Sequence, residues 1–398
     1  MDFTYDDEQV ALRDAVRGLA TRAYGDFEQR RRTVAEDPGF SEKVWTQMAE
    51  MGLLGLPFPE QVGGVGAGPV EVGIVAAELG RVIAPEPFLT SVVLAGGLVA
   101  AAGTPEQQAD VLGRLSGGEA VLAFAHNEPW GNPGPAARWA PTATTVTASD
   151  PDGTWLLGGV KEPVAHGLRA DLLVVSAALP AGGTGLFLVP GDGPGVSRTG
   201  YSTYDGGRAA RIAFDGAPAT RLGAPGVDQS ATIVAAAAQA RVAACHEALG
   251  AMEVALSATT DYLRTRKQFG VPLATFQALT FRAADMYVSL EMARSTTLWA
   301  AMVLATGDRE RGIEAATRAG LQVSRSGRHI GQEAIQLHGG IAMTAEYLVG
   351  NLTARLTALD HLLGDGHHHL TTLAAGVSGY AALDPLAGQR VGGGDEAP

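Results

Sequence analysis

The N-terminal part of the chain, residues 1–119, carries apolar residues at helical spacing, broken at intervals by Gly and Pro. This pattern predicts an N-terminal helical domain, because positions three and four apart share one face of a helix. The predicted segments are Asp6–Arg30, Glu42–Glu50, Glu71–Leu79 and Leu89–Ala101. The glycine-rich stretch 63–68 lacks the spacing of a dinucleotide-binding loop and follows no apolar strand, which favours a connecting loop.

The pattern changes between residues 120 and 225 to short apolar runs, many of them rich in β-branched residues. Gly, Pro and Asp separate these runs at short intervals, as is typical of strands joined by turns. The runs cover residues 120–126, 144–149, 154–160, 171–179, 184–190 and 208–214. The sequence therefore predicts a central all-β domain, either a barrel or a sandwich.

Helical spacing returns in residues 226–382. The predicted helices are Ser230–Lys267, Thr275–Ala305, Arg309–Leu337, Ala345–Leu363 and His367–Ala382. Long helices with short connections indicate a C-terminal four-helix bundle, and the Gly-rich residues 383–398 are expected to form a disordered tail. The predicted fold class is α+β, with helical, strand-rich and helical domains in that order.

Composition narrows the function classes. The chain has 398 residues, of which 46% are hydrophobic and 18% charged, values typical of a globular protein. The net charge of −13 argues against nucleic acid as a partner, and no apolar run is long enough to cross a membrane. With Cys245 as its one cysteine, no signal-peptide pattern and no metal-binding motif, the chain is expected to be cytoplasmic and free of metal.

Positive charge gathers where the first long bundle helix ends, at Arg264, Arg266 and Lys267, just before Phe269 and Gly270. A helix cap explains part of this, because Gly suits the position after a helix and cations complement the helix dipole. A cap does not explain the aromatic residue, the glutamine that begins the next helix, or the polar double-glycine segment 335–340. Together these features suit a dinucleotide cofactor.

The segments YLRTRKQFGVPLATFQ and IQLHGGIAMTAEY resemble the two C-terminal signatures of the acyl-CoA dehydrogenase family. The resemblance extends over nearly the whole chain and implies the fold of that family. The segments AFAHNEP, GYSTYDGGRAARI and CHEALGAMEVALSATTDYLRTRKQFG are most similar to small subunits of the pimeloyl-CoA dehydrogenase kind and to other bacterial heteromeric members.

The resemblance implies that the chain binds FAD across a subunit interface. Residues expected at the flavin ring are Phe124, His126, Asn127, Val164 and Ala165; residues expected at the rest of the cofactor are Arg266, Phe269, Gln277, Gln336, Gly339 and Gly340. Arg266 is expected to reach the pyrophosphate of the neighbouring subunit's cofactor. The family usually has a hydroxyl side chain where this chain has Asn127, Ala165 and Pro133, so the flavin edge departs from the common pattern.

The resemblance also identifies two positions that carry the catalytic glutamate in well-known branches. These positions hold Ala240 and Leu363, and neither is acidic. Glu247 lies two helical turns after Ala240 on the same alanine-lined face and is the candidate base. The alternatives are that Glu247 only pairs with an Arg or His at a helix interface, or that Asp365 or another acid is the base.

The implied reaction is FAD-dependent dehydrogenation of an acyl-CoA to the trans-2-enoyl thioester. Substrate contacts are expected from Arg241, Ala240 and Ala244, although Arg241 can also be read as a salt-bridge partner inside the helix. The alanine-lined face would leave room for a bulky acyl group. Two other functions stay open: a non-catalytic partner subunit of a heteromer, and a flavin monooxygenase or oxidase.

The implied partners are a second subunit, in a homo- or heterotetramer or dimer, and an electron-transfer flavoprotein as electron acceptor. An acyl carrier protein remains an alternative to CoA as the substrate handle, because Pro133 stands where a phosphate-contacting serine is usual.

Overall fold

The computed structural model describes residues 4–129, 147–149 and 154–377. Pro133, the predicted tail 383–398 and the end of the last predicted helix lie outside the described residues. The N-terminal region is helical: α1 (Asp7–Tyr24), α2 (Phe27–Ala35), α3 (Glu42–Glu50), α4 (Pro69–Arg81), the π-helix η2 (Phe88–Gly96), α5 (Gly97–Ala102) and α6 (Pro105–Ser116).

One helix prediction in this region is wrong, and one helix was not predicted. The segment predicted as one helix, Asp6–Arg30, is two helices, because α1 ends at Tyr24 with Gly25 as its C-cap and the carboxylate of Asp26 caps the start of α2. Helix α6 has no predicted counterpart. Its start carries a recognisable signal, a capping box in which Thr104 and Gln107 satisfy each other's backbone amides ahead of an apolar stripe.

The strands form a barrel, one of the two predicted alternatives. They are β1 (Leu122–Ala125), β2 (Thr147–Ser149), β3 (Trp155–Ala165), β4 (Leu172–Ala178), β5 (Thr184–Pro190), β6 (Val196–Ser202) and β7 (Arg208–Arg221). The sheet closes on itself because β4 pairs with β1 and β2 along one edge and with β5 along the other, and β5 reaches β7. Strand β6, which was not predicted, is mostly exposed and pairs with β7.

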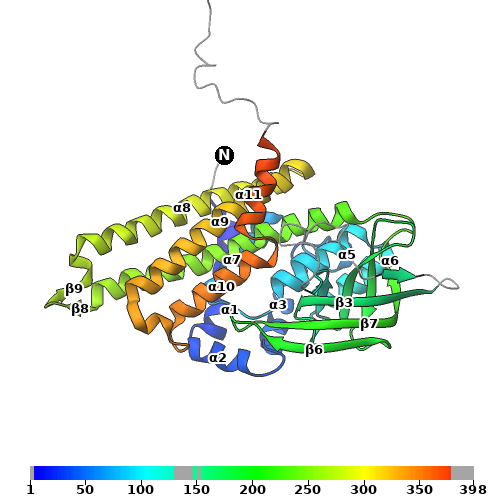
Figure 1. The fold of residues 1–398 in the computed structure, drawn as a ribbon, viewed down its shortest axis with the longest axis horizontal. Helices are drawn as coiled ribbons and strands as arrows, with labels where there is room; N and C mark the ends of the chain where they lie inside the picture. Colours follow the sequence, from blue (N-terminus) through cyan, green and yellow to red (C-terminus); the bar gives the residue numbers. More distant parts are fainter. Residues whose placement is uncertain (1–3, 130–146, 150–153, 378–398) are drawn as a thin grey trace, which may run out of the picture.

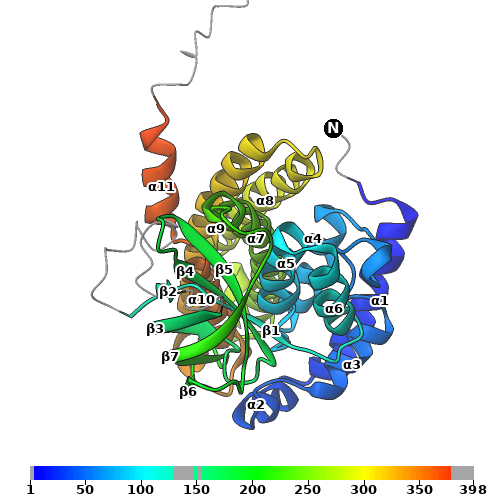
Figure 2. The ribbon, with the colours of Figure 1, turned by 90° about the vertical axis from the view of Figure 1, so that its right-hand side faces the viewer.

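The C-terminal helices are α7 (Ser230–Thr265), α8 (Gln277–Ala305), α9 (Arg309–His338), α10 (Leu348–Leu362) and α11 (Gly366–Ala375). Between α7 and α8 lies a small hairpin, β8 (Lys267–Gln268) and β9 (Val271–Pro272). Helices α7 to α10 run side by side, and the hairpin projects at the end of this bundle away from the barrel (Figure 1). In the view turned by 90°, the strands lie on one side of the N-terminal helices α1, α3 and α6 (Figure 2).

Helices α4 and α7 pack backbone to backbone, which places the middle of α7 precisely against the N-terminal region. A Cβ atom on Gly80 would lie 2.0 Å from the carbonyl oxygen of Glu247, and one on Gly250 would lie 2.0 Å from that of Ala77. Only glycine allows so close an approach, because real Cβ contacts are much longer.

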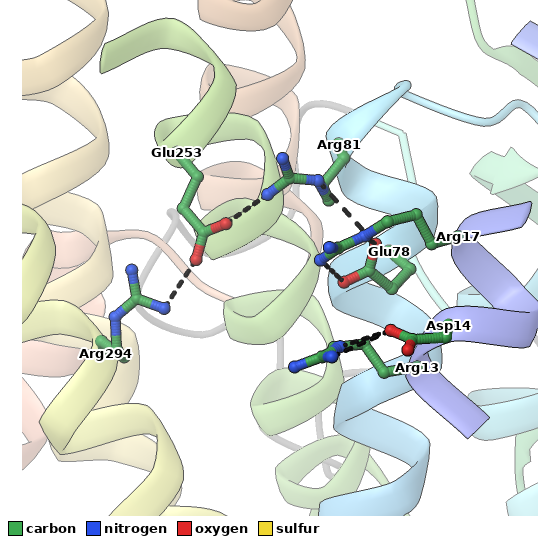
Figure 3. Close-up of polar contacts among 7 residues, drawn as sticks. All are labelled: Arg13, Asp14, Arg17, Glu78, Arg81, Glu253 and Arg294. Atoms are coloured by element: carbon green, nitrogen blue, oxygen red, sulfur yellow. Dashed lines mark hydrogen bonds and ion pairs between the residues drawn. The ribbon is translucent and has the colours of Figure 1, made fainter. Parts of the chain in front are cut away.

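Charged side chains link these helices at one end of the packed surface (Figure 3). Arg17 of α1 donates two hydrogen bonds to Glu78 of α4, at 2.8 and 2.7 Å. Arg81 pairs with both Glu78 and Glu253 of α7, and Arg294 of α8 donates to Glu253 at 2.6 Å. The chain of ion pairs therefore ties α1, α4, α7 and α8 together, with Arg13 and Asp14 paired beside it.

Candidate active site

A small cavity lies where the barrel meets the helices, and we call it the junction cavity. It is lined by Thr90, Leu94, Phe124, His126, Asn127, Pro163, Ala165 and Leu362. Four of the residues predicted at the flavin ring, Phe124, His126, Asn127 and Ala165, thus come together in one cavity. The fifth, Val164, is fully buried in the adjacent core of the barrel.

A buried lysine fixes the loop that forms one wall of the junction cavity. Lys161, on β3, donates from Nζ to the carbonyl oxygen of His126 at 3.0 Å and to Glu128 at 2.8 Å. The ring of His126 hydrogen-bonds Ser176 at 2.8 Å and stacks on Phe124. Burial lowers the pKa of Lys161 to about 8, although the carboxylate of Glu128 opposes this shift.

Asn127, one of the residues that line the junction cavity, has a polar side-chain atom that the described residues leave unpaired. The side-chain oxygen Oδ1 of Asn127 is buried and has no hydrogen-bond partner among the described residues, whereas its backbone oxygen accepts from Glu162 at 2.8 Å. A buried polar atom without a partner is unusual and suggests that a ligand supplies one. An isoalloxazine ring carries N–H and C=O groups along one edge and an aromatic face, so the residues present fit a flavin.

The other predicted cofactor residues gather at the hairpin end of the bundle, which we call the bundle tip. They are Arg266, Phe269, Gln277, Gln336, Gly339 and Gly340, and all of them are exposed. The ends of α7 and α9 are held together there, because the rings of Tyr262 and His338 lie 4.5 Å apart. The bundle tip points away from the barrel, so it does not complete the junction cavity of its own chain (Figure 1).

Phe269 shows how open the bundle tip is. Its side chain is 90% exposed, and Arg266 forms no hydrogen bond or ion pair through its side chain within the described part of the chain. A Cβ atom on Gly339 or Gly340 would meet nothing within 4 Å. An exposed aromatic ring beside a free guanidinium and bare backbone is costly to maintain unless a partner or ligand covers it.

Glu247 is buried in the middle of α7 and is 6% exposed. Arg355 of α10 donates from Nε to its Oε1 at 2.7 Å, and the same guanidinium donates from Nη1 to Asp205 at 2.8 Å. Burial opposes the charge of Arg355, but the two carboxylates prevail and raise its pKa above the usual value. The pairing with an arginine at a helix interface, one of the two interpretations of Glu247, is therefore present.

The predicted substrate residues lie on the neighbouring turns of α7. Arg241 is buried and donates from Nε and Nη2 to the carbonyl oxygen of Leu363, at 3.2 and 2.9 Å. Arg241 forms no ion pair with a described carboxylate, and burial lowers its pKa to about 10. Ala240 is fully buried in the core, whereas Ala244 lines a cavity of about 30 Å³ beside Arg241.

The alanine-lined face is therefore mostly filled by packing rather than open. The Asp365 alternative has a structural duty, since its carboxylate caps α11 by accepting from the amide of His368. No group of three or more His, Cys, Asp or Glu side chains within the described ranges is arranged to hold a metal ion. No described helix is both long and apolar enough to span a membrane.

Comparisons with known proteins match both the N-terminal and the C-terminal regions of the chain to one family. Residues 6–119 match the model for the acyl-CoA dehydrogenase N-terminal domain, and residues 231–378 match the model for the acyl-CoA dehydrogenase C-terminal domain. The acyl-CoA dehydrogenase FadE27 of Mycobacterium tuberculosis is 30% identical over 88% of this chain and 91% of its own length. This chain belongs to the acyl-CoA dehydrogenase family.

Other members of the acyl-CoA dehydrogenase family support the assignment. The human mitochondrial short-chain specific acyl-CoA dehydrogenase is 30% identical over 75% of this chain and 74% of its own length. Among solved structures, the ChsE4-ChsE5 complex from Mycobacterium tuberculosis superposes with a TM-score of 0.85 at 27% identity, covering 96% of this chain and 100% of the other. A Tcur3481-Tcur3483 steroid ACAD variant gives 0.83 at 31% identity, covering 94% and 98%.

Family membership confirms the resemblance drawn from the two C-terminal signatures and the α+β fold class. It also makes the chain an enzyme of the flavin oxidoreductase class. Three residues at the site, Thr90, Asp205 and Arg355, were not predicted. Asp205 lies in the segment GYSTYDGGRAARI, but nothing in that segment indicates its partner, because its pairing with Arg355 joins residues 150 positions apart.

Proposed function

We propose that this chain dehydrogenates an acyl thioester between its α- and β-carbons, using FAD whose flavin ring lies against the residues that line the junction cavity. The observation that carries the proposal is the buried, partnerless amide oxygen of Asn127 in a cavity lined by Phe124 and His126, within a family of acyl-CoA dehydrogenases. FAD, when bound, supplies the electron-pair acceptor for the hydrogen that leaves the β-carbon as hydride. The chain's own residues must bind the thioester, exclude water and remove the α-proton.

Glu247 is the proposed base, and its surroundings support a proton-accepting role. Within the described contacts, Arg355 engages only the Oε1 atom of Glu247, so Oε2 is the oxygen that can take up a proton. When Glu247 is protonated, Arg355 still has the carboxylate of Asp205 as its counter-ion at 2.8 Å. The site therefore stays charge-balanced after proton transfer, which avoids leaving a buried cation alone.

The bundle tip is proposed to complete the cofactor site of a second subunit. Its six predicted cofactor residues are exposed, and α8 beside them carries an apolar stripe made of Phe281, Val288 and Met292. These residues lie seven and four positions apart, so they share one face of the helix. A stripe of this kind favours burial against another copy or a related chain, and the ChsE4-ChsE5 structure is such a complex of two named chains.

A second candidate function is a partner subunit that contributes a cofactor-binding tip without turning over substrate. The observation that favours it is that both common base positions, Ala240 and Leu363, are apolar, while Glu247 is already ion-paired. The two functions differ in whether the flavin-loaded chain reacts with a thioester on its own.

The test is anaerobic stopped-flow absorbance of the FAD-loaded chain mixed with a panel of acyl-CoAs. We expect the wild type to bleach the flavin and Glu247→Gln to slow bleaching by about 100-fold or more at unchanged flavin content, because general bases contribute on that scale. The matched control is Glu253→Gln, which removes an ion-paired glutamate six residues further along the same helix.

Equal bleaching in the wild type and Glu247→Gln would place the base elsewhere. A similar loss in Glu247→Gln and Glu253→Gln would mean that disturbing α7, rather than removing a base, slows the reaction. Absence of bleaching with every thioester in the wild type would favour the partner-subunit function.

A further inference from the structure

A second cavity adjoins the junction cavity, and we call it the polar cavity. It is lined by Arg30, Ile83, Ala84, Pro85, Glu86, Pro87, Leu89, Thr90, His166, Asp205, Gly207 and Arg355. Thr90 lines both cavities, so it forms the wall between them. A ligand that extends from the junction cavity past Thr90 would therefore place its far end in the polar cavity.

Glu86, one of the residues that line the polar cavity, has a carboxyl oxygen that the fold leaves unpaired. Oε1 of Glu86 accepts hydrogen bonds from the hydroxyl of Tyr24 and, at 3.2 Å, from the amide of Ser41. Oε2 of the same carboxyl is buried and has no hydrogen-bond partner in the described parts of the chain. Glu86 is only 6% exposed, and leaving such an atom unpaired is costly.

The two arginines that line the polar cavity, Arg30 and Arg355, already form hydrogen bonds or ion pairs with other residues. Arg30 donates to the carbonyl oxygens of Ile83 and Asp205, at 2.6 and 3.1 Å. Arg355 is held between Glu247 and Asp205. These cations disfavour an ammonium group nearby, and the carboxyl groups of Glu86 and Asp205 disfavour a carboxylate.

The wall of the polar cavity formed by His166 and Thr90 carries no charge. His166 is joined to the hydroxyl of Thr90 at 3.0 Å, and burial lowers the pKa of His166 to about 4, so it carries no charge near neutral pH. The cavity holds about 30 Å³, room for a group of the size of a water molecule or a hydroxyl. Size, charge and the free acceptor together select a small neutral hydrogen-bond donor.

We infer that the polar cavity binds a hydroxyl group on the far end of the acyl chain, with Glu86 Oε2 as the acceptor. The inference rests on the proposed function, because it assumes an acyl thioester in the junction cavity. It makes Glu86 a specificity-determining residue and names the substrate class as hydroxylated acyl thioesters. Burial raises the pKa of Glu86 to about 7, so above that pH Oε2 carries no proton and can act only as an acceptor.

The experiment compares matched medium-chain thioesters: an ω-hydroxyacyl-CoA, the unsubstituted acyl-CoA of the same length and the corresponding ω-carboxyacyl-CoA. For the FAD-loaded chain we expect kcat/KM to favour the hydroxylated compound by about 10-fold or more, the scale of a hydrogen bond to an otherwise unpaired carboxyl. Glu86→Gln puts an amide donor where the acceptor was, and we expect the ratio of hydroxylated to unsubstituted kcat/KM to fall about 10-fold.

Glu119→Gln is the matched control, since it makes the same chemical change at an exposed position outside both cavities. Thr90→Val is the second variant, because it removes a wall hydroxyl with little change in volume and also reduces the ratio if the far end of the acyl chain passes Thr90. An unchanged ratio in Glu86→Gln, or a wild-type preference for the unsubstituted or the carboxylated compound, would overturn the inference.

Isothermal titration calorimetry with the same compounds separates this inference from the proposed function. If no thioester bleaches the flavin, the proposed function fails. A tighter Kd for the hydroxylated compound that weakens in Glu86→Gln would then still support the polar cavity as a hydroxyl site. Equal Kd values across the three compounds would reject it.

Discussion

The junction cavity and the bundle tip are both proposed to contact FAD, the tip in a second subunit, but they are built in opposite ways. In the junction cavity, polar groups are buried and held by internal hydrogen bonds, as Lys161 holds the backbone of His126. At the bundle tip, Arg266 and Phe269 are exposed, and the ring of Phe269 meets only the edge of Phe276 among the described aromatic rings. One half of the site is preorganised by the fold of the chain, and the other half is exposed.

This difference indicates that the junction cavity and the bundle tip interact with different partners. Preorganised polar groups position a ring and a reacting carbon, where small displacements are costly. An exposed tip gains order only when something covers it, and its direction away from its own barrel makes a second subunit the natural cover (Figure 1). Mutations in the junction cavity are therefore expected to lower the stability of the fold, and mutations at the bundle tip are expected to weaken FAD binding.

The largest effect is expected from Lys161→Met, which would break the junction cavity. The side chain of Lys161 is fully buried and that of Glu128 is 6% exposed, so the substitution removes a cation 2.8 Å from a buried carboxylate. We expect the free energy of unfolding to fall by about 3–5 kcal/mol in urea denaturation. Lys43→Met, at an exposed position, is the control. A loss below about 1 kcal/mol would show that the loop does not depend on Lys161.

An intermediate effect is expected from Glu86→Gln, which should reduce the pH dependence of the protein's stability. Burial raises the pKa of Glu86 from 4.5 to about 7, so the folded state holds this proton while the unfolded state has released it. Glu86 therefore lowers stability as pH rises from about 4.5 through 7, by up to about 3 kcal/mol. Urea midpoints at pH 5 and pH 8 should differ less in Glu86→Gln than in the wild type. The same pH dependence in both proteins would contradict this prediction.

A smaller effect is expected from Arg266→Ala at the bundle tip. We expect FAD affinity to fall by about 2 kcal/mol, the scale of a hydrogen bond to a charged group, while the unfolding free energy of the FAD-free chain stays unchanged. Fluorescence titration with FAD measures the first quantity and urea denaturation the second. Arg264→Ala is the matched control, because Arg264 lies on the same helix end but pairs with Asp261. Equal FAD affinity in both variants would remove Arg266 from the site.

Much of the fold and part of the candidate site follow from local patterns. Apolar spacing predicts the long helices α7 to α9 to within two residues at each end, because each buries one continuous face. The motif around Arg266 and Phe269 is contiguous in sequence, so its place after a helix end could be predicted. Helix α6 could have been found too, since the Thr104–Gln107 capping box is a local signal.

The surroundings of the proposed base could not be predicted in this way. Glu247 meets Arg355 across 108 residues, and Arg355 meets Asp205 across 150. No periodicity or spacing specifies such pairs, because they form only when α7, α10 and the turn between β6 and β7 pack together. The same holds for the polar cavity, whose walls come from α2, the segment after α4, η2, the barrel and α10.

The sequence by itself determined the order of helical and strand-rich regions, the family and the residues of the bundle tip, since these depend on neighbours along the chain. Only the tertiary structure decided that the strands close into a barrel, that Glu247 is paired on one oxygen, and that Glu86 keeps a buried oxygen without a hydrogen-bond partner among the described residues. The physical reason is that burial and pairing of polar groups depend on contacts between distant segments, which local patterns do not encode.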